Sequence, residues 1–141
     1  LYLGEALAAL EGTETANVTA SGMGAITAVI MELCSADDHI VSSRTIYGGT
    51  YAFMKNFLKK FNIATSFLDI TNMEAVAKSI TPKTKMIYCE SVSNPLLEVA
   101  DITDLYKIEI LYFMYSVFTP ISNNDFSRNF PKLSCATLPT K

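Results

Sequence analysis

The chain has 141 residues, 50% of them hydrophobic and 18% charged, a composition that predicts one globular α/β unit and excludes a disordered or fibrous segment. Its net charge is −3 and its only arginines are Arg44 and Arg128, so no basic patch is expected to bind nucleic acid. The longest apolar run, residues 108–118, includes Glu109 and is shorter than the roughly 20 residues that cross a bilayer, so we expect a buried strand and no membrane partner.

The start of the chain predicts a helix, a strand and a second helix. Residues 4–10 are rich in alanine and leucine and lead to Gly12, as in a helix with a glycine stop. Residues 17–20 predict a short strand. Residues 21–33 predict a buried helix, because apolar side chains surround it almost completely.

The middle of the chain continues this alternation. A turn at residues 37–39 precedes a strand over residues 40–45, and residues 51–61 have the apolar spacing of an amphipathic helix. Its apolar face consists of Phe53, Met54, Phe57, Leu58 and Phe61. The later elements are a strand at residues 64–70, a helix capped by Asn72 that runs to Ile80, and a buried strand at residues 86–89 that ends at Glu90.

Strands that alternate with helices at these spacings predict βαβ units, and hence a parallel or mixed sheet flanked by helices on both faces. Beyond Asp104 the pattern weakens, because an aromatic strand at residues 110–118 precedes a polar stretch without a clear period. We therefore expect residues 1–120 to form one partial α/β domain. Residues 121–141 are expected to be a divergent, poorly packed tail.

The cysteines and the first residue bear on disulfides, metal sites and the start of the chain. Cys34, Cys89 and Cys135 are odd in number, widely spaced and without a C-x-x-C pair, so we predict neither disulfides nor a metal site. Leu1 is not a natural start, which predicts a missing N-terminus. No targeting segment is visible, so a cytoplasmic location is the default expectation.

Small residues at positions 20–25 lie between the first predicted strand and the helix after it. Backbone amides at a helix start lack intrahelical partners and lie at the positive end of the helix dipole, so they can bind a phosphate. A tight turn that uses glycine for packing is an equal alternative. A dinucleotide fingerprint is disfavoured, because Thr27 replaces the third glycine and no acidic residue follows at the required distance.

Two further segments lie at predicted strand ends. Tyr47 precedes Gly48 and Gly49, so a ligand can approach the backbone and the ring can lie over a planar cofactor, although a core tyrosine beside a loop has the same pattern. Glu90 and Asn94 follow another strand, where ligands bind in open α/β sheets, unless Asn94 only forms a turn with the proline after it. A phosphorylated, planar, aromatic ligand would unite all three segments.

Five motifs follow one another with a familiar spacing. They are Leu10-Glu11-Gly12, Ala20-Ser21-Gly22-Met23, Asp38-His39-Ile40-Val41, Tyr47-Gly48-Gly49-Thr50 and Glu90-Ser91-Val92-Ser93-Asn94-Pro95. With them, residues 10–102 resemble the cystathionine γ-synthase, cystathionine γ-lyase and methionine γ-lyase family of fold-type-I pyridoxal-phosphate transferases. The resemblance implies pyridoxal 5'-phosphate as cofactor and makes residues 1–120 part of its large domain.

The resemblance also implies roles for individual residues. The implied cofactor-binding residues are Ser21, Gly22, Met23, Tyr47, Glu90 and Asn94. Ser21, Gly22 and Met23 match the phosphate loop, and Asn94 matches the amide near the ring hydroxyl. Tyr47 would stack on the pyridine ring and relay protons as a catalytic residue. The lone histidine, His39, is expected to be a structural turn residue.

The later part of the chain departs from the family pattern. Tyr115 stands where the family has an aspartate that keeps the pyridine nitrogen protonated, which a tyrosine cannot do. Lys141 is the candidate for the Schiff-base lysine, but a terminal residue lacks neighbours to hold it in place. The arginine for the substrate carboxylate, the C-terminal domain and the N-terminal arm are not found in this sequence.

The parent family eliminates or replaces the γ-substituent of small sulfur amino acids and forms homo-oligomers. We expect this chain to be an incomplete copy without that activity. Homo-oligomers are expected for the parent family and not for this chain. A non-catalytic module that pairs with a full-length subunit through an exposed apolar face is the alternative. Gly49 stands where bacterial methionine γ-lyases have a cysteine, which favours the synthase, cystathionine lyase or plant lyase branches.

Overall fold

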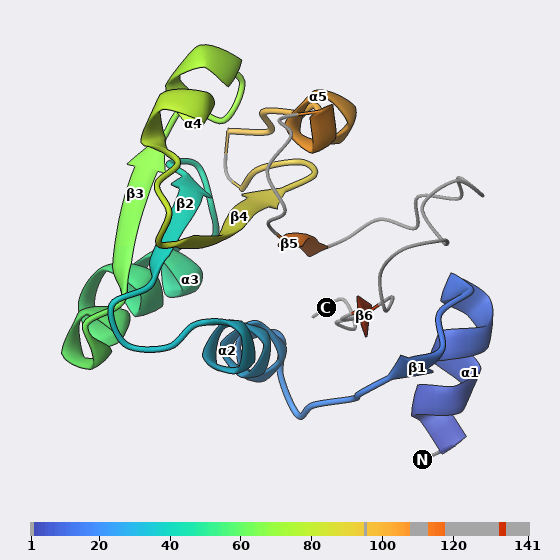
Figure 1. Cartoon of the computed structure of the whole chain (residues 1–141). Coiled ribbons are helices and arrows are strands. Elements are labelled where there is room, and N and C mark those ends of the chain that lie inside the picture. The colour runs from blue at the N-terminus through green and yellow to red at the C-terminus, as the bar shows by residue number, and fades with distance from the viewer. Residues whose placement is uncertain (1, 95, 108–112, 118–132, 135–141) are drawn as a thin grey trace. The chain divides into compact units, whose positions relative to one another are not determined.

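The computed structural model describes residues 2–94, 96–107, 113–117 and 133–134 (Figure 1). The chain forms two compact units. The first unit contains the residues up to Ala28 and those from Val117 onward, and the second unit is Val29–Ser116. Among the helices in these described ranges, none is long and apolar enough to cross a membrane.

The first unit contains helix α1 (Tyr2–Glu11) and a pair of short strands. The predicted glycine stop is confirmed, because Gly12 has a φ of +64° directly after α1. Strand β1 (Thr15–Ala16) pairs in parallel with β6 (Leu133–Ser134). A Cβ atom at Gly4 would lie 2.5 Å from the carbonyl oxygen of Ala16, so α1 can approach β1 closely only with glycine at this position.

The strand predicted at residues 17–20 is wrong, because these residues form irregular backbone after β1. Local side-chain bonds explain the difference. Thr19 Oγ1 donates to the Ser21 carbonyl oxygen at 2.8 Å, and Ser21 Oγ accepts from the Gly24 amide at 3.0 Å. Such contacts satisfy the backbone without a neighbouring strand.

Helix α2 (Gly22–Leu33) begins as the sequence predicts, after Ser21. It is not buried all round. Ala25 and Ile30 are buried, whereas Met31 and Glu32 are exposed. The apolar composition of the helix therefore misled the prediction, since small residues such as alanine are tolerated on either face.

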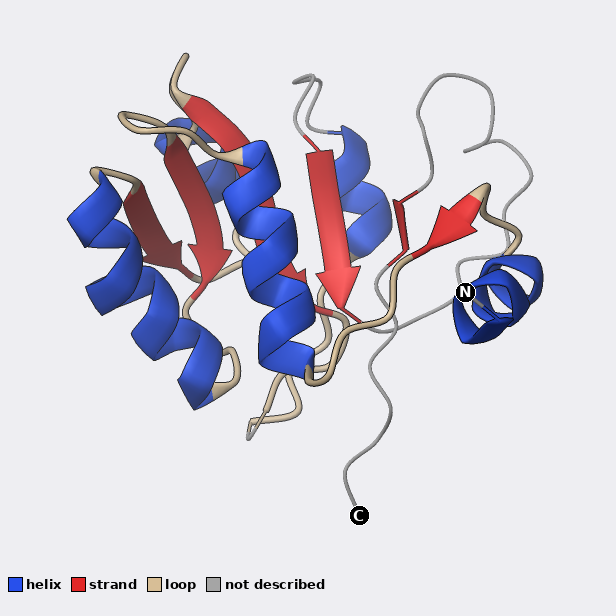
Figure 2. Cartoon of the chain, turned by 90° about the horizontal axis from the view of Figure 1, so that it is seen from below, coloured by secondary structure: helices blue, strands red, loops and turns tan. Residues whose placement is uncertain are grey.

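The second unit is built on a four-stranded sheet with the order β3-β2-β4-β5. Its strands are β2 (His39–Ser43), β3 (Ala64–Leu68), β4 (Thr84–Glu90) and β5 (Phe113–Val117). Strand β2 pairs in parallel with both β3 and β4, and Figure 2 shows helices on both faces of the sheet. The predicted α/β class is therefore confirmed.

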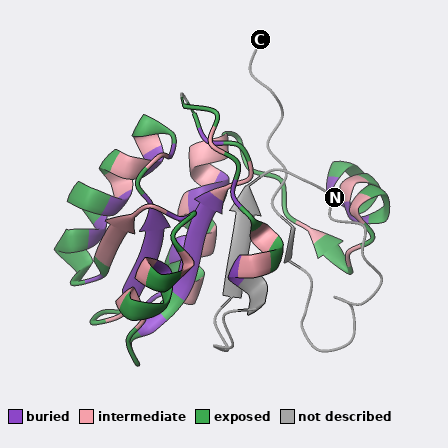
Figure 3. Ribbon diagram, turned by 90° about the horizontal axis from the view of Figure 1, so that it is seen from above, coloured by how far each residue is buried: buried purple, intermediate pink, exposed green. Residues whose placement is uncertain are grey.

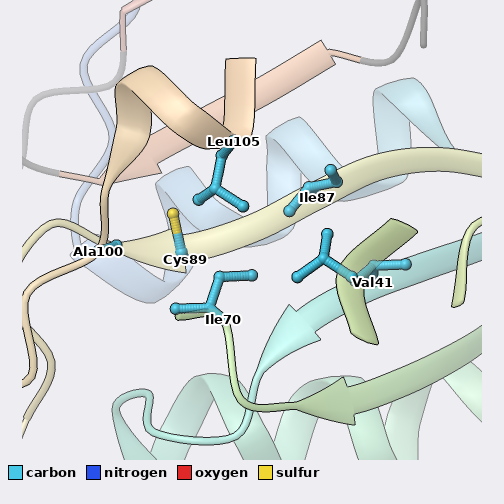
Figure 4. Close-up of a cluster of buried hydrophobic side chains, with 7 residues drawn as sticks. Val41, Ile70, Ile87, Cys89, Ala100 and Leu105 are labelled. Carbon is cyan, nitrogen blue, oxygen red and sulfur yellow. The ribbon is translucent and has the colours of Figure 1, made fainter. Parts of the chain in front are cut away.

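One face of this sheet carries a core cluster under helices α4 (Met73–Ser79) and α5 (Ile102–Lys107). Its buried members are Val41, Ile70, Val76, Ile87, Cys89, Ala100 and Leu105. The members labelled in Figure 4 point toward one another. All five residues of β2 are buried (Figure 3). Burial on both faces is what a central parallel strand requires.

Helix α4 is capped as predicted, because Asn72 Oδ1 accepts from the Ala75 amide at 3.0 Å. On the opposite face of the sheet from the core cluster, Tyr51 of helix α3 (Gly48–Ala52) packs against Phe67 of β3, with ring centroids 4.5 Å apart. Helix α3 starts before the predicted residue 51. A π-helical turn (Phe53–Phe57) and a 3-10 turn (Leu58–Phe61) then replace the expected regular helix.

The predicted apolar face of this helical segment is only partly correct. Met54 and Leu58 are buried, but Phe57 and Phe61 are largely exposed. The Phe57 ring instead stacks on that of Phe53 and makes a tilted contact with that of Phe61, with centroids 5.2 Å apart in both pairs. Helical spacing brings these rings together whether or not the core covers them.

The remaining predictions concern strand ends and the tail. The strands expected at residues 64–70 and 86–90 are confirmed as β3 and β4. His39 is not a turn residue but the first residue of β2, and it is buried. The strand expected at residues 110–118 is described as β5 over Phe113–Val117, whereas most of residues 121–141 lie outside the described part of the chain.

Candidate functional site

The carboxyl ends of β2 and β4 bring three of the predicted site residues together. Glu90 is the last residue of β4. Its Oε1 accepts a hydrogen bond from the Tyr47 amide at 2.8 Å, and its Oε2 accepts one from the Asn94 amide at 3.2 Å. One carboxylate therefore joins the loop after β2 to the loop after β4, at the edge where ligands bind in open parallel sheets.

Tyr47 directly precedes α3 and presents its ring to the surroundings. The residue has extended backbone dihedral angles, and 53% of its surface is exposed. Nothing lies within 4 Å of the point where a side chain on Gly48 would begin. The side chain of Tyr47 is therefore accessible to a ligand.

Asn94 lies near the tip of a narrow loop after β4. The Ser93 amide donates to the Glu98 carbonyl oxygen at 2.8 Å, and the Ala100 amide donates to the Ser91 carbonyl oxygen at 3.1 Å. Leu97 in this loop has a left-handed φ of 55°, a conformation that costs about 1–2 kcal/mol for a residue with a side chain. The loop thus holds a defined shape with Asn94 exposed.

A second carboxylate joins the same two loops, and sequence reasoning missed it. Glu98 Oε2 accepts from Thr45 Oγ1 at 2.7 Å. Thr45 in turn bonds to Ser43, with 3.0 Å between their hydroxyl oxygens. The partners Thr45 and Glu98 are 53 residues apart in the sequence, and neither residue type marks a motif, so no sequence signal pointed to this pair.

The sulfur and ionic groups near this edge are structural. Burial, reinforced by the charge of the neighbouring Glu90, raises the pKa of the Cys89 thiol to about 11, so this thiol stays protonated and is no nucleophile near neutral pH. Arg44 forms an exposed ion pair with Asp69 at 2.8 Å. Hydrogen bonds from Thr71, with a smaller effect of Arg44, lower the pKa of the Asp69 carboxyl.

The predicted phosphate loop lies at the start of α2. Ser21 caps this helix through its bond to the Gly24 amide, and Gly22 and Met23 form the first helical residues. A capped helix start is a suitable anion site, because the helix dipole adds to its amide groups. Lys141 lies outside the described residues, and Tyr115 is placed in β5, beside β4 in the order of the sheet.

No group of three histidine, cysteine, aspartate or glutamate side chains that could hold a metal ion occurs in the described part of the chain. The lone histidine belongs to the opposite end of β2 from Tyr47. Its ring nitrogens bond to Thr84 Oγ1 and Ser66 Oγ at 2.8 and 2.9 Å. Burial lowers the pKa of His39, which keeps the ring neutral between these hydroxyl groups.

A family model described as Cys/Met metabolism PLP-dependent enzyme matches residues 2–112 of the sequence. The match covers most of the chain. The chain belongs to this family. The cofactor of this family is pyridoxal phosphate. The five motifs all lie within the matched residues.

A similar relative in this family is methionine gamma-lyase of Arabidopsis thaliana, with 49% identity over 110 residues. The aligned part is 77% of this chain and 25% of that relative, so the chain spans about a quarter of the length of the relatives it matches.

Solved structures of the family have the same fold. O-acetylhomoserine sulfhydrylase of Wolinella succinogenes matches with a TM-score of 0.80 and 30% identity, over 83% of this chain and 34% of that one. A putative O-acetylhomoserine (thiol)-lyase of Campylobacter jejuni matches with a TM-score of 0.75 and 34% identity, over 83% of this chain and 29% of that one. The latter structure contains a pyridoxyl-lysine phosphate.

The residues of the family's motifs fit this cofactor in the second unit. An exposed tyrosine ring, open space at Gly48 and an exposed asparagine are gathered at one sheet edge. The amide groups that position them are already bonded to Glu90. The accessible groups at this edge are thus of the kinds that an aromatic, hydroxyl-bearing cofactor ring requires.

Proposed function

We propose that this chain is the partial cofactor-binding domain of an enzyme that eliminates or replaces the γ-substituent of a sulfur amino acid. Residues 1–120 would form that partial domain, and residues 121–141 a divergent tail. The observation that carries the proposal is that the Tyr47 and Asn94 amides both donate to the Glu90 carboxylate. It brings together the residues that the family's motifs assign to the cofactor ring.

Each residue has a chemical task in this proposal. The Tyr47 ring would stack on the pyridine ring, and its hydroxyl would relay protons during elimination by giving up its own proton and taking one back. The Asn94 side chain would donate to the ring hydroxyl, and the start of α2 at Ser21, Gly22 and Met23 would bind the phosphate. Pyridoxal phosphate, when bound, supplies the electron sink for the reaction.

Glu90 has a different task from a direct cofactor ligand. Both of its oxygens accept backbone amides, and a carboxylate held by such bonds is a strong acceptor because the bonds are charge-assisted. Glu90 would therefore act on the cofactor through Tyr47 and Asn94. We assign it a positioning role.

Binding of pyridoxine 5'-phosphate by the 141-residue chain tests the proposal. This analogue has no aldehyde, so it cannot react with lysines, and calorimetry reports only the non-covalent cradle. We expect saturable binding, weaker binding of pyridoxine without the phosphate, and a loss of about three- to tenfold in Tyr47→Ala, which lacks the stacked ring. Tyr47→Phe keeps the ring and should bind within about twofold of the unchanged chain.

Tyr2→Ala is the matched control, because Tyr2 is also an exposed tyrosine but lies in α1. It should bind the analogue as the unchanged chain does. Absence of binding, or an equal loss in both alanine variants, would contradict the proposal.

The isolated chain should have no lyase or sulfhydrylase activity of its own. Tyr115 replaces the acid that the family pattern requires. Borohydride reduction in the presence of pyridoxal phosphate, followed by peptide mass spectrometry, should find no preferred adduct on Lys141. Stoichiometric labelling of Lys141 would show that this part of the proposal is wrong.

A second candidate is a non-catalytic module that pairs with a full-length subunit. It is favoured by four exposed apolar side chains in the loop after β4, which are Val92, Leu96, Leu97 and Val99. Co-expression with a full-length member of the family should then yield a complex. Leu97→Asp should disrupt that complex, while cofactor binding by the chain alone should remain.

A further inference from the structure

We propose that Glu98 is a positioning residue that fixes the orientation of Tyr47 against Asn94, through its hydrogen bond from Thr45. The inference rests on the proposed function and deepens it, because it names a residue outside the family's motifs that sets the geometry of the ring site. No ligand contact is assigned to Glu98 itself.

The first step of the argument is the route of the hydrogen bonds. Thr45 Oγ1 donates to Glu98 Oε2 at 2.7 Å, two residues before Tyr47. The Glu98 amide donates to Ser93 Oγ at 2.9 Å, and the Ser93 amide donates to the Glu98 carbonyl oxygen at 2.8 Å, one residue before Asn94. Glu98 thus connects the residues that precede both Tyr47 and Asn94.

The second step is that two separate contacts between the loops after β2 and β4 restrict the orientation of Tyr47 more than one contact does. The Glu90 carboxylate holds the two loops together at the Tyr47 and Asn94 amides. The Arg44 amide also donates to the Leu68 carbonyl oxygen at 2.8 Å, and the Tyr51 amide donates to the Tyr47 carbonyl oxygen at 3.0 Å, but neither contact reaches the loop after β4. The bond between Thr45 and Glu98 adds a second, separate contact between the same loops, which further restricts the direction of the Tyr47 peptide.

The third step is the chemistry of the bond. A hydroxyl that donates to a carboxylate makes a short, charge-assisted bond that is stronger than one between neutral groups. Thr45 and Glu98 are half-buried, whereas Ser93 is buried at 3% exposure. Partial shielding from water strengthens the contact, since water competes less well for either partner.

The test uses the full chain and the analogue pyridoxine 5'-phosphate. Thr45→Val keeps the shape of the side chain and removes the hydroxyl, and Glu98→Ala removes the acceptor. Each should weaken analogue binding by roughly tenfold and shift the amide NMR signals of Tyr47 and Asn94. Thr45→Ser and Glu98→Gln retain a donor and an acceptor, respectively, and should restore most of the affinity.

Thr71→Val is the matched control. Thr71 Oγ1 also donates to a carboxylate at 2.7 Å, that of Asp69, in the loop after β3. The same loss of a hydroxyl there should leave analogue binding and both amide signals unchanged. A combined Glu90→Gln and Thr45→Val variant should lose more than the sum of the single changes, because each remaining contact partly compensates for the other.

The outcomes separate the two proposals. If the unchanged chain binds the analogue and Thr45→Val binds it equally well, the inference about Glu98 is overturned while the proposed function stands. If the unchanged chain does not bind, the proposed function fails and the NMR signals decide the inference. In that case, unchanged Tyr47 and Asn94 signals in Thr45→Val overturn it, and shifts in both, absent in Thr71→Val, support it.

Discussion

The two ends of strand β2 use polar side chains in opposite ways. At its amino end, the His39 ring bonds to hydroxyl groups on both neighbouring strands, Thr84 of β4 and Ser66 of β3. At its carboxyl end, Glu90 and Glu98 bond to the loops that carry Tyr47 and Asn94. The first set of contacts is complete in itself, whereas the second leaves a ring and an amide side chain exposed.

The contacts at the amino end of β2 serve the stability of the fold, whereas those at its carboxyl end serve ligand binding. A buried histidine whose two nitrogens both have partners gains nothing from a ligand, and its loss removes one partner from each of two hydroxyl groups. Exposed side chains held by bonded backbone contribute little to folding but are already positioned for a ligand. Changes at the amino end should therefore affect unfolding, and changes at the carboxyl end should mainly affect binding.

The largest expected effect is at the amino end. His39→Ala removes one buried and one partly buried side-chain hydrogen bond and leaves a cavity, so we expect the free energy of unfolding to fall by about 2–3 kcal/mol in urea denaturation. His39→Asn can keep the bond to Thr84 and should lose about half as much. Analogue binding should not change when it is measured at 10 °C to keep both variants folded. A large loss of affinity would contradict the assignment of His39 to stability alone.

The next effect is at the carboxyl end. Glu90→Gln leaves only one acceptor oxygen for the amides of Tyr47 and Asn94, so we expect a loss of about 1–2 kcal/mol in the free energy of unfolding. Affinity for pyridoxine 5'-phosphate should fall roughly tenfold, since one loop is released. Glu74→Gln is the control, because Glu74 is an exposed partner of Lys78 in α4; if it weakens binding equally, the effect of Glu90 is not specific.

The sequence alone pointed to the residues that meet at the carboxyl end of β2, but not to the hydrogen bonds of His39 at its amino end. Tyr47, Glu90 and Asn94 belong to motifs that the family repeats, so a resemblance located them. His39 was expected in a turn, because a histidine after two aspartates gives no sign of partners 27 and 45 residues away. Glu98 was missed for the same reason, since its bond to Thr45 exists only once the two loops meet.

The same limit explains the errors in the helices. Apolar periodicity identified α2 and the segment after α3, because that signal is local. It could not tell that the rings of Phe57 and Phe61 would cover each other on the surface. Which apolar residues enter the core depends on the sheet that the helix meets, and sequence spacing does not contain that information.

A smaller effect concerns the pH dependence of stability. Burial lowers the pKa of His39 in the folded chain below its ordinary value of 6.5, so the unfolded chain binds more protons between these two values. The free energy of unfolding should therefore be constant well above pH 6.5 and decrease as the pH falls through this value. His39 is the only histidine of the chain, so His39→Gln should remove this slope, and a slope that persists in the variant would assign it to other groups.

The smallest effect should come from the exposed ion pair at the carboxyl end. Arg44→Gln removes the partner of Asp69, but both side chains are open to solvent, and such pairs contribute about 0–1 kcal/mol. We expect a change in the free energy of unfolding below about 0.5 kcal/mol, and less in high salt. Analogue binding should also remain within about twofold of the unchanged chain, since small stability effects of exposed pairs rarely reorganise a loop. A tenfold loss would place Arg44 among the residues that hold Tyr47, because Arg44 is three residues from it, and would extend the binding region of β2 toward β3.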